Sequence, residues 1–226
     1  MRLGQREQIE KYAKNQMAKL GLYAWPHVKR VERYCLLISK FEAENKSIDL
    51  EVLRTAALLH DIAKHLEKKK SSGNHGEIGA IMAHDFLKTI GVNEAKISLI
   101  CHAIRVHTHR EKPFSVEAKI LHDADFLDKL GAVGIASVFI KACLTNTTIE
   151  EVAEMYDLET PKPSYVAKHV RWLKKQHFYT QTAEKMAKRR NEITSLFFKA
   201  LKNELNSAGL RKRNKVIHSN CVKFYA

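Results

Sequence analysis

Ala56-Ala57-Leu58-Leu59-His60-Asp61-Ile62-Ala63-Lys64 is an apolar helical run that ends in an adjacent His and Asp, with a Lys three residues further on. Burying these two polar side chains together at the end of a core helix costs free energy unless something binds them. A divalent metal would do so, because imidazole and carboxylate both coordinate first-row metals. A single His-Asp pair is more often a packed histidine beside a turn-capping carboxylate, so the interpretation depends on the rest of the chain.

Helix geometry predicts how these side chains are placed. Asp49 is the expected N-cap. Ala57, His60 and Lys64 share one helix face, and Asp61 lies about 100° further round. Two adjacent ligands converge on one ion only near a helix end, where the backbone leaves room. The polar residues 68–74 follow, with three consecutive lysines, as a loop and a candidate mobile lid over a site.

The composition is that of a globular protein whose positive charge is concentrated towards its C-terminus. Its 226 residues are 45% hydrophobic and 28% charged. Residues 1–160 carry 23 Lys/Arg against 22 Asp/Glu, whereas residues 161–226 carry 16 against 3, a net of +13. Such a segment suits a nucleic acid, a phosphorylated ligand or an anionic surface. A solvated helix face followed by a tail explains the charge equally well.

The sequence indicates a cytoplasmic protein that is not associated with a membrane. No apolar run approaches the roughly 20 residues that span a bilayer, and the first seven residues contain no apolar signal segment. The four cysteines have neither CxxC nor disulfide-framework spacing, so we expect reduced thiols. They are Cys35, Cys101, Cys143 and Cys221. Nothing in the sequence sets an oligomeric state.

The fold class predicted from these patterns is all-α. Nine Gly and four Pro favour long helices with short connections, and apolar residues recur at helical spacing along most of the chain. We expect a single domain over 1–208, with a core at about 22–141, further C-terminal helices within about 147–208, and a basic tail at 209–226. Those C-terminal helices are predicted at 147–157, 164–176 and 180–207.

A histidine earlier in the chain is a candidate partner of the His-Asp pair. Pro26 suits the first turn of a helix, where its missing N–H costs nothing. His27 therefore lies at the mouth of that helix and shares its apolar face with Val31 and Cys35. Taken alone, a histidine at such a position is more often a core residue than a ligand.

A later segment supplies carboxylates. Three Asp in six residues, Asp123, Asp125 and Asp128, interrupt the apolar helix predicted within 120–135. Asp125 and Asp128 are three residues apart and face the same way. The surrounding Leu, Phe and Ile leave little surface for a solvated acidic face, which argues for a buried role. Two glycines of this segment, at 131 and 134, predict a bend or tight helix packing.

The remaining histidines divide into candidates and an imitation. His75 opens a helix and lies on its buried side. In the following helix His102 shares the apolar face, whereas His107 lies at the end and faces elsewhere, so at least one of these two is expected to be packed or solvated. His84-Asp85 imitates the pair, but His84 points away from the apolar face and is expected at the surface.

These elements together resemble the HD-domain metal-dependent phosphohydrolases. The matching motifs are His27-x-x-Arg30-Val31, Leu59-His60-Asp61, His75-Gly76 and Asp123-Ala124-Asp125-x-Leu127-Asp128-x-Leu130-Gly131-Ala132-x-Gly134-Ile135. Their order and spacing agree across residues 22–141. The chain is most similar to a small bacterial subgroup with the DAD-x-LD-x-LGA-x-GI signature. Thr182-Ala183-x-x-Met186-Ala187-x-x-Arg190 matches its C-terminal helix, so the resemblance covers all but about the last 17 residues.

The resemblance implies an HD-domain-like helical bundle, with additional C-terminal helices, around a divalent ion such as Mn²⁺, Mg²⁺ or Fe²⁺. By position the metal ligands are His27, His60, Asp61 and Asp125. Asp123 is the alternative for the last place. Related proteins with a second metal add histidines from the HG element and the next helix, which here are His75, His102 and His107; these would contact a second metal or a phosphate.

Two departures from the family pattern bear on the substrate more than on metal binding. Phe126 stands where Arg is usual, and His122 stands where Gln is usual. The predicted lid is also unusually rich in lysine. The resemblance therefore implies a phosphorylated small molecule, expected to be a nucleotide, without naming which one.

The hypothesis that follows is hydrolysis of a phosphate ester or phosphoanhydride. The catalytic residues implied are Asp61, Lys64, His75 and Asp123. Lys64 would hold a non-bridging phosphate oxygen, while His75 and Asp123 would orient or deprotonate water. Lys64 and Arg105 are the candidate substrate-binding residues, with Arg105 and the lysines of 68–70 adding positive charge. Ordinary surface charge is the alternative for those added cations.

Two other functions fit the same sequence. One is a degenerate HD bundle that acts as a nucleic-acid-binding or regulatory module through its basic C-terminal third. The complete ligand set argues against it, because a lapsed site has no physical reason to keep two His and several Asp in a core. The other is a metal oxygenase on the same scaffold, since a fold does not fix its chemistry.

Overall fold

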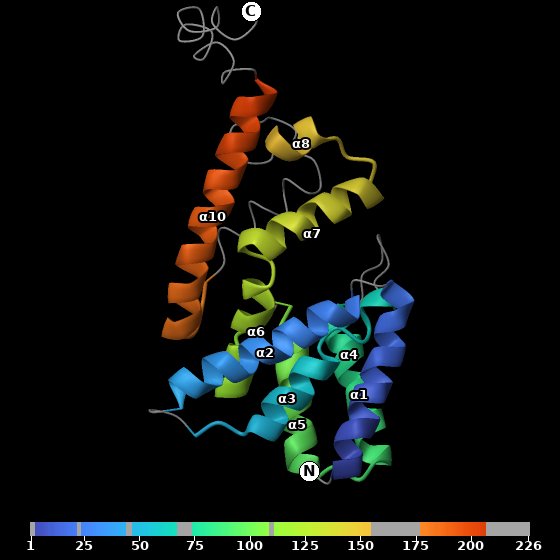
Figure 1. Ribbon diagram of the computed structural model, residues 1–226. Helices are drawn as coiled ribbons and strands as arrows, with labels where there is room; N and C mark the ends of the chain where they lie inside the picture. The colour runs from blue at the N-terminus through green and yellow to red at the C-terminus, as the bar shows by residue number, and fades with distance from the viewer. Residues whose placement is uncertain are drawn as a thin grey trace, which may run out of the picture. The chain divides into compact units, whose positions relative to one another are not determined.

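The structure is a computed structural model that describes residues 3–21, 24–43, 47–66, 74–108, 111–154 and 177–206. All regular secondary structure in these ranges is helical (Figure 1), which confirms the predicted fold class. The predicted lid loop except its last residue, Asn74, the helix predicted at 164–176 and the basic tail lie outside the described residues. None of the described helices is both long and apolar enough to cross a membrane.

Residues up to Asp128, together with His177–Ala187, form one compact unit within the described ranges. Its helices are α1 (Leu3–Met17), α2 (Ala24–Glu42), α3 (Leu50–Leu59), α4 (His75–Thr89), α5 (Glu94–Val106) and α6 (Val116–Leu127), with short 3₁₀ turns at Ala18–Leu20 and Lys64–Leu66. Helix α3 contacts α1, α2, α5 and α6. It is therefore the central element of this unit, and its C-terminal end lies among the helices that surround it.

Helix α3 forms where the sequence predicts it. The Asp49 carboxylate accepts hydrogen bonds from the backbone N–H groups of Glu51 and Val52 at 2.9 and 3.1 Å, which confirms the predicted N-cap. From residue 52 to residue 59 every side chain except Arg54 is buried. The helix ends at Leu59, so His60 and Asp61 sit at a helix end inside the core, as expected.

The second compact unit comprises the described residues of 129–154 and 188–206. It contains α7 (Gly131–Leu144), α8 (Ile149–Glu154) and the larger part of α10 (Gln181–Leu205), which begins in the first unit. Its buried core consists of Ile135, Val138, Ala142, Val152 and Phe198, with Phe139 and Leu201 packed against them. Whether 1–208 behaves as a single domain stays a prediction.

The helical chain is interrupted after Leu127, and α7 begins at the first of the two glycines singled out in the sequence. Gly131 has φ +68°, a left-handed conformation that favours glycine. A Cβ on Gly134 would lie 2.2 Å from the carbonyl oxygen of Lys129, so the turn of chain before α7 can close only around a glycine. The chain therefore leaves helical geometry just after the three aspartates, and Asp128 becomes the C-cap of α6.

Candidate metal centre

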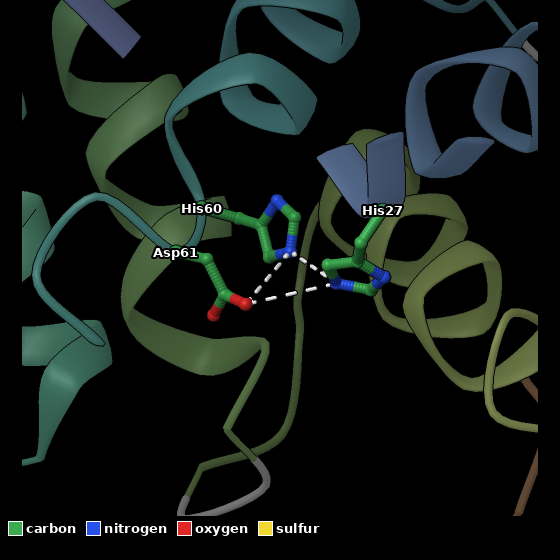
Figure 2. A group of neighbouring side chains, drawn as sticks. All are labelled: His27, His60 and Asp61. Carbon is green, nitrogen blue, oxygen red and sulfur yellow. Dashed lines mark hydrogen bonds and ion pairs between the residues drawn. The ribbon is translucent and has the colours of Figure 1, made fainter. Parts of the chain in front are cut away.

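The two histidines and the aspartate predicted as metal ligands converge. His27 projects from the first turn of α2, and His60 and Asp61 directly follow α3. Figure 2 shows their side chains pointing toward one another. The two Nε2 atoms of the histidines are 3.4 Å apart, and each lies 3.6 Å from Oδ2 of Asp61. These three atoms form a compact group of nitrogen and oxygen donors.

Asp125 of α6 adds the fourth predicted ligand. Its Oδ1 lies 3.4 Å from Nε2 of His27 and 4.0 Å from Nε2 of His60. Donor atoms bound at about 2.0–2.2 Å from one metal lie about 3 to 3.6 Å apart, by tetrahedral or octahedral geometry. The separations among His27, His60 and Asp61 equal this spacing, whereas Asp125 lies up to 4.0 Å from the histidines and outside their compact group. The first three donors therefore fit a divalent ion, and Asp125 can join them after a movement of its side chain.

A second group of donors lies on the other side of Asp61. His75, the first residue of α4, and His107, the C-cap of α5, place their Nε2 atoms 3.4 and 3.5 Å from Oδ1 of Asp61. The three residues form a second compact group of donors. Asp61 thus presents one carboxylate oxygen to each group, as a carboxylate that bridges two ions does.

The surroundings of Oδ1 of Asp61 test best whether metal ions fit this site. This oxygen is buried and accepts no hydrogen bond from the described residues. The nitrogens of His75 and His107 are near it, but at distances too long for strong hydrogen bonds. A buried carboxylate oxygen without a partner is costly. A cation between Asp61 and the two histidines would remove that cost.

Two of the buried histidines are held in the form that binds metal. Nδ1 of His60 donates to the carbonyl oxygen of Ala57 at 2.8 Å, and Nδ1 of His107 donates to that of Ile104 at 2.6 Å. Because a carbonyl only accepts, Nδ1 carries the proton in both rings and Nε2 faces the centre. Burial lowers the pKa of His60 to about 4 and also lowers the pKa of His107. Both are thus neutral imidazoles near pH 7, the state that coordinates metals.

Asp61 is ionised and forms an ion pair with Lys64. Burial raises the pKa of Asp61, but the positive charge of Lys64, together with smaller contributions from the neighbouring histidines, outweighs burial and holds that pKa well below its ordinary value. Nζ of Lys64 donates to Oδ2 of Asp61 at 2.7 Å, and the Lys64 side chain is 38% exposed. Lys64 therefore lies at the rim of the site, between the buried donors and solvent.

The structure separates the two histidines at positions 102 and 107. The helical pattern had His107 facing elsewhere, while the family resemblance made it a candidate for a second metal; it is 2% exposed and belongs to the second donor group. His102 is partly exposed, stacks on Phe114 with ring centroids 3.6 Å apart, and accepts a hydrogen bond from the Phe114 N–H. The reason is that the buried face of α5 carries Ile100, Ala103 and Ile104, and His107, whose backbone is still helical, continues that face. Arg105 is exposed and belongs to neither donor group.

Asp123 occupies a different environment from Asp125. Its fully buried carboxylate accepts hydrogen bonds of 2.7 to 3.1 Å from the N–H of Tyr179 and from the N–H and hydroxyl of Thr180. These bonds attach the start of α10 to α6. This arrangement favours Asp125 as the fourth ligand, and the contacts of Asp123 support a structural role in place of the predicted catalytic one.

Two further positions bear on the sequence interpretation. His84 and Asp85 lie at the surface, with side chains 40% and 75% exposed, which confirms that this pair is an imitation. Asp128 was assigned no role, although its carboxylate lies 2.7 Å from Nδ1 of His27. Its sequence signals were its spacing of three residues from Asp125 and its place in the motif that carries the resemblance.

Gly76 explains why His75 reaches His107, and its substitution gives a test. A Cβ at Gly76 would lie 2.7 Å from the carbonyl oxygen of Arg105, so Gly76→Ala must push the start of α4 away from the end of α5. We expect a loss of about 1–3 kcal/mol of stability from this overpacking, together with weaker binding of the second metal. Thermal unfolding and Mn²⁺ bound per chain measure the two effects.

Gly79→Ala is the matched control on the same helix. There the new Cβ would make ordinary contacts, the nearest being 3.4 Å from Cγ2 of Ile104. We expect stability to stay equal or to rise by up to about 1 kcal/mol, because Ala is favoured over Gly within helices. Identical behaviour of the two variants would contradict the close-approach account.

Comparisons with known proteins identify a family and several similar proteins. The model of the family described as HD domain matches residues 25–130. YpgQ of Bacillus subtilis, an uncharacterized protein, is 30% identical over 147 residues, which are 62% of this chain and 67% of that protein. Its crystal structure in complex with ADP covers 88% of this chain and 96% of that chain, with a TM-score of 0.62 and 22% identity.

Two solved structures of higher identity are called hydrolases. A predicted HD superfamily hydrolase from an uncultured Thermotogales bacterium has a TM-score of 0.61 and 27% identity, covering 88% of this chain and 92% of that one. An HD-superfamily hydrolase from Bacillus thuringiensis has a TM-score of 0.63 and 26% identity, covering 89% and 98%.

Proposed function

This chain belongs to the HD-domain family, and from that premise we propose that it is a divalent-metal-dependent phosphohydrolase acting on a phosphate ester or phosphoanhydride, with a nucleotide as the preferred substrate class. The observation that carries the proposal is the convergence of donors on both oxygens of Asp61. The relatives called hydrolases support a hydrolytic reaction. The phosphoryl specificity is our inference from the charge of the site.

The donor groups assign residues to two ions. His27, His60 and Asp125 would hold one ion with Oδ2 of Asp61. His75 and His107 would hold the other with Oδ1. When bound, such ions polarise phosphoryl oxygens and lower the pKa of a water molecule. Four imidazoles in the donor set favour Mn²⁺ or Fe²⁺ over Mg²⁺, which prefers oxygen ligands.

Lys64 is the residue best placed to bind substrate. Its ammonium group touches Asp61 and is partly exposed, so a short rotation of its flexible side chain would bring it to a phosphate oxygen at the rim. An ammonium group there offsets the negative charge of the incoming phosphate. Arg105 is further out, and we propose it only as a source of attraction for a polyanionic ligand.

We propose His75 as a ligand of the second ion and not as the predicted proton acceptor, because an imidazole that coordinates through Nε2 and carries a proton on Nδ1 has no free lone pair. Its side chain is 14% exposed, against 2% for His107, so it borders the solvent-facing part of the second group. Hydrolysis forms a bond from a water oxygen to phosphorus and breaks the bond from phosphorus to the leaving oxygen, which takes up a proton. The attacking water would give up its proton to solvent at this open rim beside His75.

The nucleotide preference rests on a relative. YpgQ, which is 30% identical to this chain, has been crystallised in complex with ADP. We propose that a nucleoside phosphate also binds here, with its phosphates towards Lys64 and the donor groups.

Metal removal tests the proposal. Protein treated with a chelator and then dialysed should release no phosphate from nucleoside mono-, di- or triphosphates. Addition of Mn²⁺ or Fe²⁺ should restore release from at least one of them by orders of magnitude, because the ions supply several kcal/mol of transition-state stabilisation. Equal phosphate release with and without metal would contradict the proposal.

Binding of nucleic acid is the second candidate function. Exposed cations lie along α10, at Lys188, Arg189, Lys199 and Lys202, and the final third of the sequence carries a net charge of +13. If this candidate is right, RNA binding will weaken steeply as salt rises and will not depend on metal.

We also propose a cytoplasmic location, since Cys35, Cys101 and Cys143 are free thiols.

A further inference from the structure

The Nδ1 atom of His27 has a different kind of partner from the Nδ1 atoms of His60 and His107. His60 and His107 donate from Nδ1 to backbone carbonyl oxygens of their own helical turns. Nδ1 of His27 instead lies 2.7 Å from Oδ2 of Asp128, a side chain 101 residues away in sequence. His27 stands in the first turn of α2, so no preceding helical turn supports its ring.

Asp128 is itself held by Arg30. Nε of Arg30 donates to Oδ1 of Asp128 at 2.7 Å, and Nη2 donates to Oδ2 at 2.9 Å, which is a bidentate arrangement. The carboxylate is only 3% exposed, and it caps the C-terminal end of α6, where the helix dipole disfavours negative charge. A buried anion at that position needs compensation. Arg30 and His27 supply it.

The four residues form two facing pairs. His27 and Arg30 are three residues apart on α2, and Asp125 and Asp128 are three residues apart on α6 and its C-cap. Asp125 lies 3.4 Å from Nε2 of His27, and Asp128 lies 2.7 Å from Nδ1. Nδ1 of the ring therefore faces Asp128 while Nε2 faces Asp61 and Asp125, and the contact with Asp128 decides which nitrogen is left for the centre.

We propose that Asp128, held by Arg30, is a positioning residue that fixes the tautomer and orientation of His27 and thereby sets the affinity of the first donor group for a divalent ion. The proposal rests on the metal-dependent function proposed above. The carboxylate keeps the proton on Nδ1 and the lone pair on Nε2, which faces His60 and Asp61. Metal-binding histidines are commonly held in this way, and the residues that hold them affect metal affinity strongly.

A role limited to joining α2 and α6 predicts different results. An ion pair that only joins helices would change the free energy of unfolding and leave Mn²⁺ affinity nearly unchanged. A positioning role changes Mn²⁺ affinity through His27 and through no other ligand. Metal affinity, measured separately from turnover, therefore distinguishes the two roles.

The experiment is a titration of the full-length, chelator-treated protein with Mn²⁺, in which free Mn²⁺ is read from its electron paramagnetic resonance signal. We expect Asp128→Ala to raise the Kd for the Mn²⁺ ion of the first donor group about 10- to 100-fold. Arg30→Gln should raise the same Kd by a smaller factor. Asp128→Asn keeps the size of the side chain and gives a second estimate if Asp128→Ala fails to fold.

Glu32→Gln is the matched control. Glu32 is a buried carboxylate on the same helix, 4% exposed, and it pairs with Lys29 at 2.5 Å and with Arg54 at 3.6 Å. Its change removes a buried negative charge of α2 without touching any proposed ligand. Its Mn²⁺ Kd should stay within about twofold of the unmodified protein, an order of magnitude below the effect expected at Asp128.

A double-mutant cycle shows whether Asp128 acts through His27. In a His27→Ala background, Asp128→Asn should change the Mn²⁺ Kd no further, because the residue it positions is gone. Equal effects of Asp128→Asn with and without His27, or an unchanged Kd in Asp128→Ala while the unmodified protein binds Mn²⁺, would overturn the positioning role alone. Absence of Mn²⁺ binding by the unmodified protein would overturn it together with the proposed function.

Discussion

Asp61→Ala is expected to abolish the binding of both metal ions and phosphate release together. Oδ2 of Asp61 lies 3.6 Å from each of His27 and His60, and Oδ1 lies near His75 and His107. One substitution therefore removes a ligand from both donor groups. We expect phosphate release to fall by at least about 10³-fold, since the ions supply several kcal/mol. Elemental analysis and a phosphate-release assay measure the two losses.

Asp85→Ala is the control for that experiment. Asp85 follows a histidine just as Asp61 does, but it lies on the surface of α4 with its side chain 75% exposed. Metal content and turnover should both stay at the level of the unmodified protein. Retained metal or retained turnover in Asp61→Ala would show that the central carboxylate has been misassigned.

His107→Ala and His102→Ala should differ by on the order of 10²-fold or more in turnover, because only the first removes a ligand of an ion worth several kcal/mol. Both histidines come from α5 or its C-cap, five residues apart. His107 is buried against Asp61, whereas His102 stacks on Phe114 away from both donor groups. The measurements are phosphate release at saturating Mn²⁺ and the number of ions bound per chain.

His102→Ala serves as the internal control of that pair. It should bind as many ions as the unmodified protein, while His107→Ala should lose one of them. If the two variants lose activity equally, the assignment of the second donor group is wrong.

The helices and the first donor group were predictable because local patterns determine them. Asp49 at a helix start and the apolar run that ends at Leu59 are features of a few consecutive residues, and the structure has both. His60 and Asp61 follow from that helix end. His27 and Asp125 came from the family resemblance, and their convergence with His60 in the structure agrees with it.

The second donor group shows how the choice of a helix face can mislead. The prediction for His107 took the apolar face of α5 to be the one that carries His102. The buried face instead carries Ile100, Ala103 and Ile104, and His107 continues it to within 3.5 Å of Asp61. Apolar residues lie on more than one side of this helix, so the sequence pattern alone leaves its buried face ambiguous.

The roles of the aspartates depended on residues far away in sequence. Asp123 accepts hydrogen bonds from Tyr179 and Thr180, which follow it by 56 and 57 residues. Asp128 meets Arg30 across 98 residues. No local pattern records such partners. The sequence therefore shows three aspartates within six residues, but it cannot tell which of them binds metal, which attaches a distant segment and which positions a histidine.

The most direct test of the central claim is to locate the metal. Crystals grown with Mn²⁺ should show an anomalous scattering peak among His27, His60, Asp61 and Asp125, with ligand distances of about 2.0–2.3 Å. A second peak is expected between Asp61, His75 and His107. Peaks at both places would establish the metal centre on which the proposed hydrolysis depends. Mn²⁺ bound elsewhere, or no peak at Asp61 in crystals saturated with Mn²⁺, would contradict it.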